Sequence, residues 1–166
     1  MRSRPSWLPF ILLALLVTAL GGMFRLYAIE RLPPGLHYDE AFNNLMALRL
    51  VQGTMEPPIY FRVEFGEEPL HIYLIATLFR LFGPTYLGGR LVSALAGTWT
   101  VFTLAFAVRE IFYARLGREK ATRLGLLAAL NLALLYWHVH YSRIGMEPAV
   151  MPALATPAFG FTWRAL

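Results

Sequence analysis

Long apolar segments alternate with short polar ones along this chain, and the alternation indicates helices in a membrane. Residues 5–24 carry no charged side chain, and roughly 20 apolar residues are what a helix needs to cross the hydrocarbon core. Residues 81–108 contain a single charge, at Arg90, while residues 124–142 contain no acid, lysine or arginine. Another apolar stretch covers residues 148–163. The pattern predicts an all-α, polytopic membrane protein.

We expect four spans, at about residues 7–24, 88–108, 124–141 and 148–164, within one transmembrane domain that covers residues 1–166. The first segment has an alternative interpretation as a signal peptide, because Arg2 and Arg4 precede it and Ala19-Leu20-Gly21 resembles a cleavage site. Its apolar run is longer than the ~7–15 residues of a signal peptide. The length favours an uncleaved anchor.

Residues 28–87 form the polar region between the first two expected spans, and they hold seven of the ten acids. Pro33, Pro34 and Gly35 block a continuing helix. From residue 39 to residue 52 the pattern is helical and amphipathic, with Gly53 at its end. One face collects Asp39, Glu40, Asn43, Asn44 and Ala47, and the opposite face collects Phe42, Leu45 and Leu48. We expect this helix to lie along the outer membrane surface.

Residues 69–82 form a shorter apolar segment that decides the topology. Fourteen residues are few for a span, so a re-entrant or interfacial helix and a true span are both open. The basic cluster of residues 109–123 separates the two, because positive residues favour the cytoplasm. Arg2 and Arg4 place the N-terminus in the cytoplasm, so the first span leads outward. The basic cluster then returns to the cytoplasm only if residues 69–82 do not cross the membrane. We therefore expect a multi-pass protein of the cell (inner) membrane with juxtamembrane helices in its outer loop.

Composition supports the membrane assignment and excludes several classes of protein. Hydrophobic residues make up 57% of the chain and charged residues 15%, with a mean hydropathy of +0.51. The net charge is +5, but the basic residues lie at segment ends, where topology explains them, so we expect no nucleic-acid partner. The absence of cysteine excludes disulfides and thiolate metal sites.

Two polar clusters share the expected outer side of the membrane and carry the candidate chemistry. The first cluster contains His37, Asp39, Glu40, Asn43 and Asn44, and the second contains His138, His140, Tyr141, Ser142, Arg143 and Glu147. Between them come Arg62, Glu67, Glu68 and His71. The carboxylates of Asp39 and Glu40 offer a general base, or ligands for a divalent cation such as Mg²⁺ or Mn²⁺. Arg143 offers bidentate binding to a phosphate.

Each of these residues also has a structural interpretation. Asp39 and Glu40 stand where acids cap a helix N-terminus. Arg143 is equally suited to an interfacial anchor. His138 and His140 are two positions apart, so a helix does not bring them to one face, and this spacing disfavours a zinc site. Tyr136, Trp137 and Tyr141 are typical of an interfacial aromatic belt.

The order of motifs resembles a known family of membrane enzymes. The motifs are Tyr38-Asp39-Glu40-Ala41, then Gly66-Glu67-Glu68-Pro69-Leu70-His71, then Arg90-Leu91-Val92-Ser93-Ala94-Leu95-Ala96-Gly97, and finally Tyr141-Ser142-Arg143-Ile144-Gly145-Met146-Glu147-Pro148. In this order they resemble the N-terminal part of the GT-C membrane glycosyltransferases, in the group of family 39 dolichyl-phosphate-mannose-protein mannosyltransferases and aminoarabinose transferases. The resemblance covers nearly the whole chain.

The resemblance implies transfer of a sugar from a polyprenyl-phosphate donor to a hydroxyl acceptor on the outer face of the membrane. The resemblance implies that Asp39 is the catalytic base, with Glu40 beside it as the second member of the catalytic pair. The resemblance and the clusters together give a substrate-binding set of Arg62, Glu68, His71, Arg143 and Glu147. Many relatives have lysine-proline where this chain has Glu68-Pro69, so contact with the donor phosphate would pass to Arg62, His71 or Arg143, or to a cation held by carboxylates.

The chain is shorter than such enzymes, so we expect it to be the N-terminal portion of one. The expected partners are the polyprenyl-phosphate-linked sugar and membrane lipids; the sequence does not specify the acceptor. The alternative is a non-catalytic small membrane protein, either a truncated relative or an assembly or transport subunit.

Overall fold

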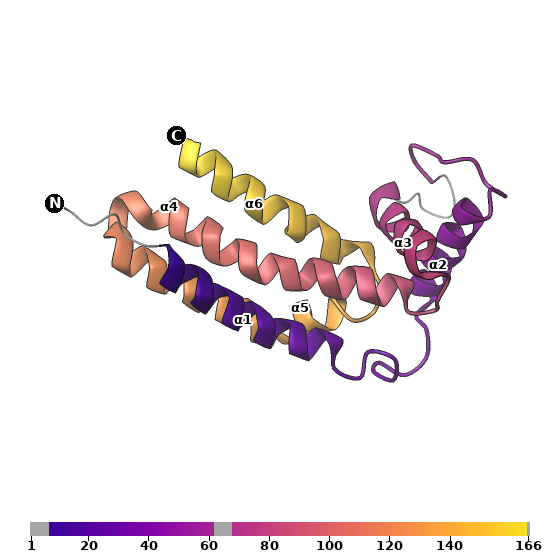
Figure 1. Cartoon of the computed structure of the whole chain (residues 1–166), viewed down its shortest axis with the longest axis horizontal. Helices are drawn as coiled ribbons and strands as arrows, with labels where there is room; N and C mark the ends of the chain where they lie inside the picture. Colours follow the sequence, from indigo (N-terminus) through magenta and orange to yellow (C-terminus); the bar gives the residue numbers. More distant parts are fainter. Residues whose placement is uncertain (1–6, 62–67, 166) are drawn as a thin grey trace.

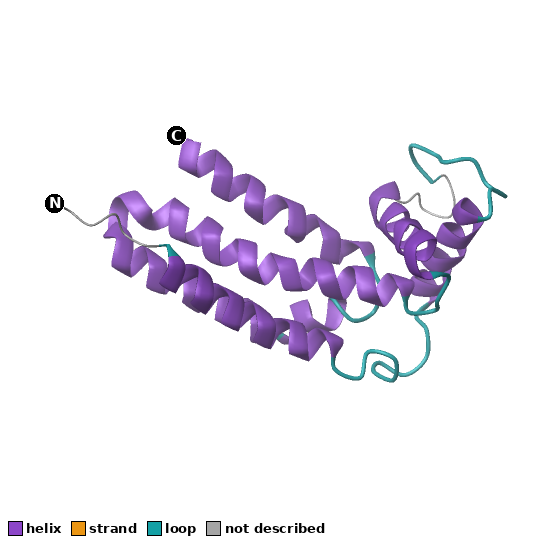
Figure 2. Cartoon of the chain, viewed as in Figure 1, coloured by secondary structure: helices purple, strands orange, loops and turns teal. Residues whose placement is uncertain are grey.

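The computed structural model describes residues 7–61 and 68–165 (Figures 1 and 2). These residues form only helices and connecting loops, with no strand among them. The elements are α1 (Leu8–Leu26), α2 (Tyr38–Val51), α3 (Pro69–Phe82), α4 (Gly88–Leu134), α5 (Tyr136–Tyr141), the 3₁₀ helix η1 (Glu147–Ala149) and α6 (Val150–Ala165). The prediction of an all-α protein is confirmed for the described residues.

Helix α4 consists of two arms that meet at Gly117. This glycine has φ 72° and ψ 169°, a backbone conformation that residues with a Cβ rarely adopt. The second arm folds back along the first, and a Cβ at Gly125 would overlap the carbonyl oxygen of Ala105. The chain therefore reverses at one residue inside the basic cluster of residues 109–123.

Four helical segments lie side by side in a bundle: α1, the two arms of α4, and α6 (Figure 1). The start of α1, the Gly117 turn and the end of α6 lie at one end, which we call the Gly117 end. Helices α2 and α3 pack together at the other, which we call the Asp39 end. Asp39 is thus separated from residues 109–123 by the length of the bundle.

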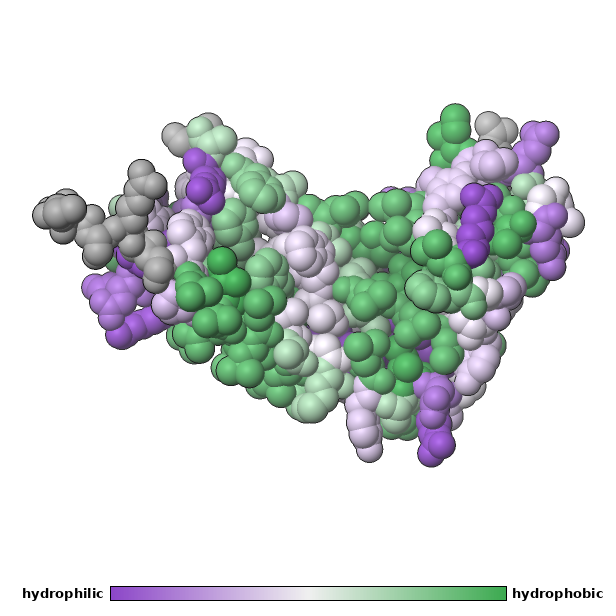
Figure 3. Space-filling model, in the orientation of Figure 1, coloured by the Kyte–Doolittle hydropathy of each residue, from purple (hydrophilic) through white to green (hydrophobic). Residues whose placement is uncertain are grey.

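Small residues let the helices of the bundle approach one another closely. Ala14 of α1 packs with Val101, Ala105, Ala129 and Ala133 of the two α4 arms in one buried cluster. Close packing through alanine and glycine is typical of helices in membranes. Large apolar side chains point outward instead, among them Leu12, Leu16, Leu95, Leu127 and Phe159. Figure 3 shows this hydrophobic surface over the middle of the bundle, with hydrophilic residues toward the ends.

Two helices, α1 and α4, are long and apolar enough to cross a membrane. The prediction of a helix at residues 69–82 is confirmed by α3, which begins at Pro69 and ends before Gly83 with φ 89°. The helix predicted for residues 39–52 is confirmed as α2, with one difference of orientation. Its polar face, which carries Glu40 and Asn43, is buried in the protein, whereas Leu45 of the apolar face is exposed.

Residues 124–141, the third expected span, do not form one continuous helix. The second arm of α4 stops at Leu134, and Leu135 is extended before the separate short helix α5. Arg25 explains the stop, because its Nη1 and Nη2 atoms donate to the carbonyl oxygens of Ala133 and Leu132 at 3.3 and 3.2 Å. The last carbonyls of a helix need such donors. The side chain of Arg25, from another helix, supplies them.

Candidate functional site

Asp39 lies in the first turn of α2, where its carboxylate remains accessible. The side chain is 34% exposed, and its Oδ2 atom lies 3.4 Å from Nδ1 of His37, the N-cap residue. The same Nδ1 atom accepts the main-chain N–H of Asp39 at 3.4 Å. Negative charge is favoured at this helix terminus. The arrangement therefore places a carboxylate at the protein surface next to an imidazole.

Glu40, the second acid of the pair, is fully buried and engaged on both oxygens. Nε of Arg90 donates to Oε1 at 2.6 Å, and Nη2 donates to Oε2 at 3.2 Å. The main-chain N–H of His37 donates to Oε2 at 3.3 Å, which completes a capping box. Glu40 is thus both a helix cap and one half of a bidentate ion pair.

The two acids therefore lie in different surroundings, and only Asp39 is accessible to a cation. Both Glu40 oxygens already accept hydrogen bonds from Arg90 and His37. Among the described residues, no group of three histidine and acidic side chains comes together to hold a metal ion. A cation bound by Asp39 would need ligands other than Glu40.

Arg90 and Arg143 fix the loop that leads from α1 to Asp39. Beyond Glu40, Arg90 donates from Nη1 to the carbonyl oxygens of Ile29 and Pro33, each at 3.0 Å, and from Nη2 to that of Gly35. Arg143 donates to four carbonyl oxygens, those of Phe24, Arg25, Tyr27 and Leu32 at 2.6, 3.2, 2.8 and 2.9 Å. Burial, and then repulsion from Arg90, lowers the pKa of Arg143. This geometry uses Arg143 as an anchor of the main chain.

Segment 145–147 packs against Glu40, so the second polar cluster contacts the first. Gly145 has φ 67°, and a Cβ there would meet Cγ of Glu40 at 2.9 Å. Oγ of Ser93 donates to the carbonyl oxygen of Met146 at 2.9 Å, which ties the segment to α4. Residues more than fifty positions apart in the sequence thus meet at the Asp39 end. The two polar clusters, which we expected on one side of the membrane, lie at one end of the bundle.

His71 lies buried below this segment, at 2% exposure. Its Nε2 atom lies 3.1 Å from the carbonyl oxygen of Gly145, and its Nδ1 atom is buried without a hydrogen-bond partner. Burial lowers the pKa of His71, and the Gly145 carbonyl and the charge of Glu147 offset this only in part. A neutral imidazole that donates from Nε2 suits these contacts. Oε2 of Glu147 is likewise buried without a partner.

The other members of the predicted substrate-binding set are Glu68 and Arg62. Glu68 is the exposed N-cap of α3 and makes no capping bond with its side chain. Arg62 lies outside the described residues. Of the predicted substrate-binding set, the structure therefore brings together His71, Arg143 and Glu147 around segment 143–147.

A cleft of about 480 Å³, which we call the Asp39 cleft, is lined by His37, two residues before Asp39; Asp39 itself is not one of its lining residues. Its lining comes from the loop before α2 and from α5 with the segment that follows it: Pro33, Pro34, Gly35, Leu36, His37, Trp137, His140, Tyr141, Ile144 and Met146. The rings of Trp137 and Tyr141 stack with centroids 6.2 Å apart. The cleft is mainly apolar, with imidazoles of His37 and His140 in its wall, which is the usual composition of a ligand pocket. Sequence analysis had assigned these aromatic residues to a membrane belt.

Sequence reasoning also missed Arg25, a fully buried arginine at the end of α1. Its Nη2 atom lies 2.6 Å from Nδ1 of His138, and Nη1 donates to the carbonyl oxygen of Gly21 at 2.8 Å. The available signal was the position of an arginine at the end of an apolar run, which is also typical of an interfacial anchor. The partners of Arg25 could not be inferred, because most of them are main-chain carbonyls.

No protein-family model, curated protein or solved structure matches this chain. The chemistry must therefore be inferred from the residues themselves. They offer an exposed carboxylate next to an imidazole, a rigid loop that holds both, and a neighbouring cleft with aromatic walls. These parts suit proton abstraction from a hydroxyl more closely than they suit metal binding.

Proposed function

We propose that this chain is the N-terminal portion of a membrane glycosyltransferase that moves a sugar from a polyprenyl phosphate to a hydroxyl acceptor. The supporting observation is the division of roles between the two acids of the outer loop. Glu40 is buried against Arg90, whereas Asp39 keeps an accessible carboxylate beside His37, and His37 lines the cleft. A buried, paired neighbour positions a catalytic group, while the exposed one can accept a proton.

In this proposal four helical segments cross the cell membrane: α1, the two arms of α4, and α6. The basic residues around Gly117 then face the cytoplasm together with the N-terminus, as the positive-inside rule favours. Helices α2 and α3 lie at the outer surface, where the exposed Leu45 and Leu81 contact lipid. The Asp39 cleft opens at the level of the outer headgroups, where a polyprenyl phosphate carries its sugar.

The reaction would run in one displacement at the anomeric carbon. The acceptor hydroxyl loses its proton to the Asp39 carboxylate as its oxygen bonds to that carbon. The bond from the anomeric carbon to the phosphate oxygen breaks, and the lipid phosphate leaves with the electron pair. His37 and His140, which line the cleft, would donate hydrogen bonds to that phosphate. The stacked rings of Trp137 and Tyr141 offer an apolar surface for the sugar or the first prenyl unit.

The test measures sugar transfer and lipid binding on the same membranes. Asp39→Asn removes the proton acceptor but keeps the size of the side chain, so transfer should fall by roughly 10²–10⁴ while binding of polyprenyl phosphate persists. Glu30→Gln is the matched control, because Glu30 is an exposed acid of the same loop, with a side chain 56% exposed.

Two outcomes would count against the proposal. Near-normal transfer by Asp39→Asn would return Asp39 to the role of a helix cap. Equal binding of polyprenyl phosphate and uncharged polyprenol by the unmodified chain would favour a non-catalytic membrane subunit.

A further inference from the structure

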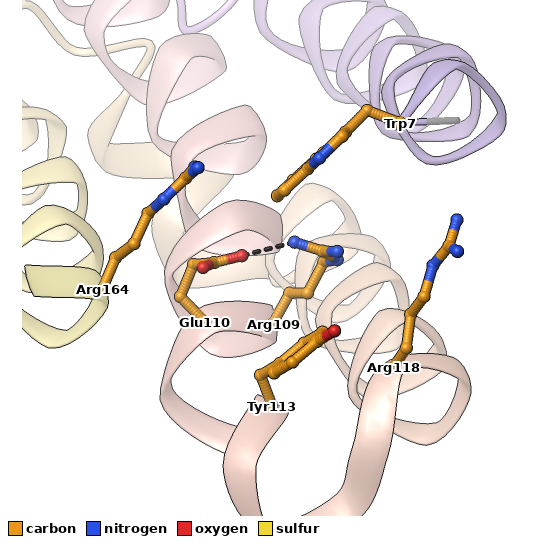
Figure 4. Close-up of a pocket in the computed structure, with 6 residues that line it drawn as sticks. All are labelled: Trp7, Arg109, Glu110, Tyr113, Arg118 and Arg164. Atoms are coloured by element: carbon orange, nitrogen blue, oxygen red, sulfur yellow. Dashed lines mark hydrogen bonds and ion pairs between the residues drawn. The ribbon is translucent and has the colours of Figure 1, made fainter. Parts of the chain in front are cut away.

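At the Gly117 end, opposite the Asp39 cleft, a second site gathers arginine side chains around Trp7. Figure 4 shows Trp7 reaching from α1 toward Arg109 and Arg164, with Arg118 on the other side of the opening. Cζ of Arg109 lies 3.7 Å from the centre of the Trp7 ring, and Cζ of Arg164 lies 5.4 Å from it. These are cation–π distances, so the indole holds two guanidinium groups at one opening.

Arg109 is the fixed part of this site. It is 5% exposed, donates from Nε to Oγ1 of Thr122 at 3.2 Å, and bonds to the carboxylate of Glu110. Around it lies a cavity of about 130 Å³, which Arg118, Tyr113 and Arg164 also line. The side chains of Arg118 and Arg164 are exposed at its mouth. A rigid base with two further cations at the rim suits an anion of phosphate size.

A larger cavity of about 520 Å³ adjoins the first, and the two share Trp7, Arg109 and Arg118. Its other lining residues fall into two groups. The apolar ones are Pro9, Phe10, Leu13 and Leu126, and the polar ones are Glu119, Thr122 and Arg123. The apolar lining comes from Pro9, Phe10 and Leu13 at the start of α1 and from Leu126 in the second arm of α4. One opening therefore leads to both a cationic pocket and an apolar groove.

The charge of the lining is positive. Arg109, Arg118, Arg123 and Arg164 face only Glu110 and Glu119 among the residues that line the two cavities. Glu110 bonds to Arg109, and Glu119 bonds to Arg123 at 2.5 Å. The excess of arginine beside an apolar groove indicates a ligand with a negative head and a hydrocarbon tail.

We propose that this site binds an anionic phospholipid from the leaflet at the Gly117 end. Its phosphate lies among Arg109, Arg118 and Arg164, and one acyl chain lies along Phe10, Leu13 and Leu126. Basic pockets between membrane helices take such headgroups, and tryptophan favours the same depth in the bilayer. The inference rests on α1 and α4 crossing a membrane and does not depend on the proposed sugar transfer.

The test titrates the purified full chain in detergent with dioleoylphosphatidylglycerol and measures bound lipid by native mass spectrometry. Phosphatidylglycerol should bind at least about tenfold more tightly than phosphatidylcholine of the same chains, because a single arginine near an anionic headgroup contributes about fivefold. Inorganic phosphate and glycerol 3-phosphate, added separately, should compete weakly, because neither has an acyl chain for the groove.

Arg118→Gln should weaken phosphatidylglycerol binding about fivefold. Arg115→Gln is the matched control, because Arg115 is an exposed arginine of the same helix outside both cavities, and its effect should stay below twofold. Circular dichroism verifies that both variants fold. Equal losses in the two variants, or equal binding of the two phospholipids, would overturn the site. Competition by free phosphate as strong as that by the lipid would replace the lipid with a soluble anion.

Discussion

At the Asp39 end of the bundle, Arg90 and Arg143 direct their guanidinium groups at main-chain carbonyls and at Glu40, whereas at the Gly117 end Arg109 lies under Trp7 beside an open cavity. The first pair is engaged in holding a loop. At the second site, cationic side chains line a cavity. In our proposals the arginines of the first end are a scaffold and those of the second bind a ligand, and the difference lies in what surrounds the guanidinium groups.

Removing Arg90 gives the sharpest test of the scaffold role. Arg90→Met leaves Glu40 buried without its cation and leaves three carbonyl groups without their donor. Breaking such a pair costs about 3–5 kcal/mol, so the variant should lose most of its stability. The measurement is the free energy of unfolding in micelles, with Arg80→Met, at an exposed arginine of α3, as the control. Equal stability of the two variants would contradict a structural role for the ion pair.

Arg143 distinguishes an anchor from a phosphate ligand. Arg143→Ala removes donors from the carbonyls of Phe24, Arg25, Tyr27 and Leu32, and should lower stability by about 1–3 kcal/mol. Arg143→Lys keeps the charge but cannot span four acceptors, so it should recover less than half of the loss.

The comparison of stability and lipid binding decides between the two roles of Arg143. A variant with unchanged stability but weaker binding of polyprenyl phosphate would make Arg143 a ligand and would remove the contrast between the two ends. Full recovery of stability by Arg143→Lys would also argue against the anchor role, because a single positive charge would then replace the four hydrogen bonds.

His71 gives the smallest expected effect, in the form of a pH dependence. Burial lowers its folded-state pKa from the ordinary value of 6.5, so the unfolded chain binds the proton more readily. Its contribution to stability is then complete above about pH 6.5 and is lost as the pH falls below that value. The unfolding temperature should decrease between pH 7.5 and pH 5, and His71→Gln should reduce the decrease. If the unfolding temperature of His71→Gln decreased as much as that of the unmodified chain, groups other than His71 would cause the decrease.

Much of the helix content could be predicted from the sequence because its signals are local. Pro69 and Gly83 bound α3, and the pattern from Asp39 onward gives α2 within one residue of its observed start. The reversal at Gly117 was not predicted, because a basic stretch at the end of a span resembles a loop whether it turns in one residue or in ten. The early end of the second α4 arm depends on Arg25, which lies more than a hundred residues away.

The site was less predictable than the helices, for a physical reason. The pairing of Glu40 with Arg90 joins positions fifty residues apart, and nothing local distinguishes Glu40 from Asp39 beside it. The partners of Arg143 are main-chain carbonyls, which every residue possesses and which therefore leave no mark in the sequence. The side of the bundle on which the polar clusters meet was predictable, because it follows from the order of apolar segments.

The central claim is that the two ends of the bundle face opposite sides of a membrane, with Asp39 outside. Single cysteines test it directly, because the chain has none of its own. Gln52→Cys at the Asp39 end and Ala114→Cys near Gly117 both replace exposed residues. In intact cells, a membrane-impermeant maleimide should label Gln52→Cys, and should label Ala114→Cys only after the membrane is opened. Equal labelling of both cysteines in intact cells would contradict the account.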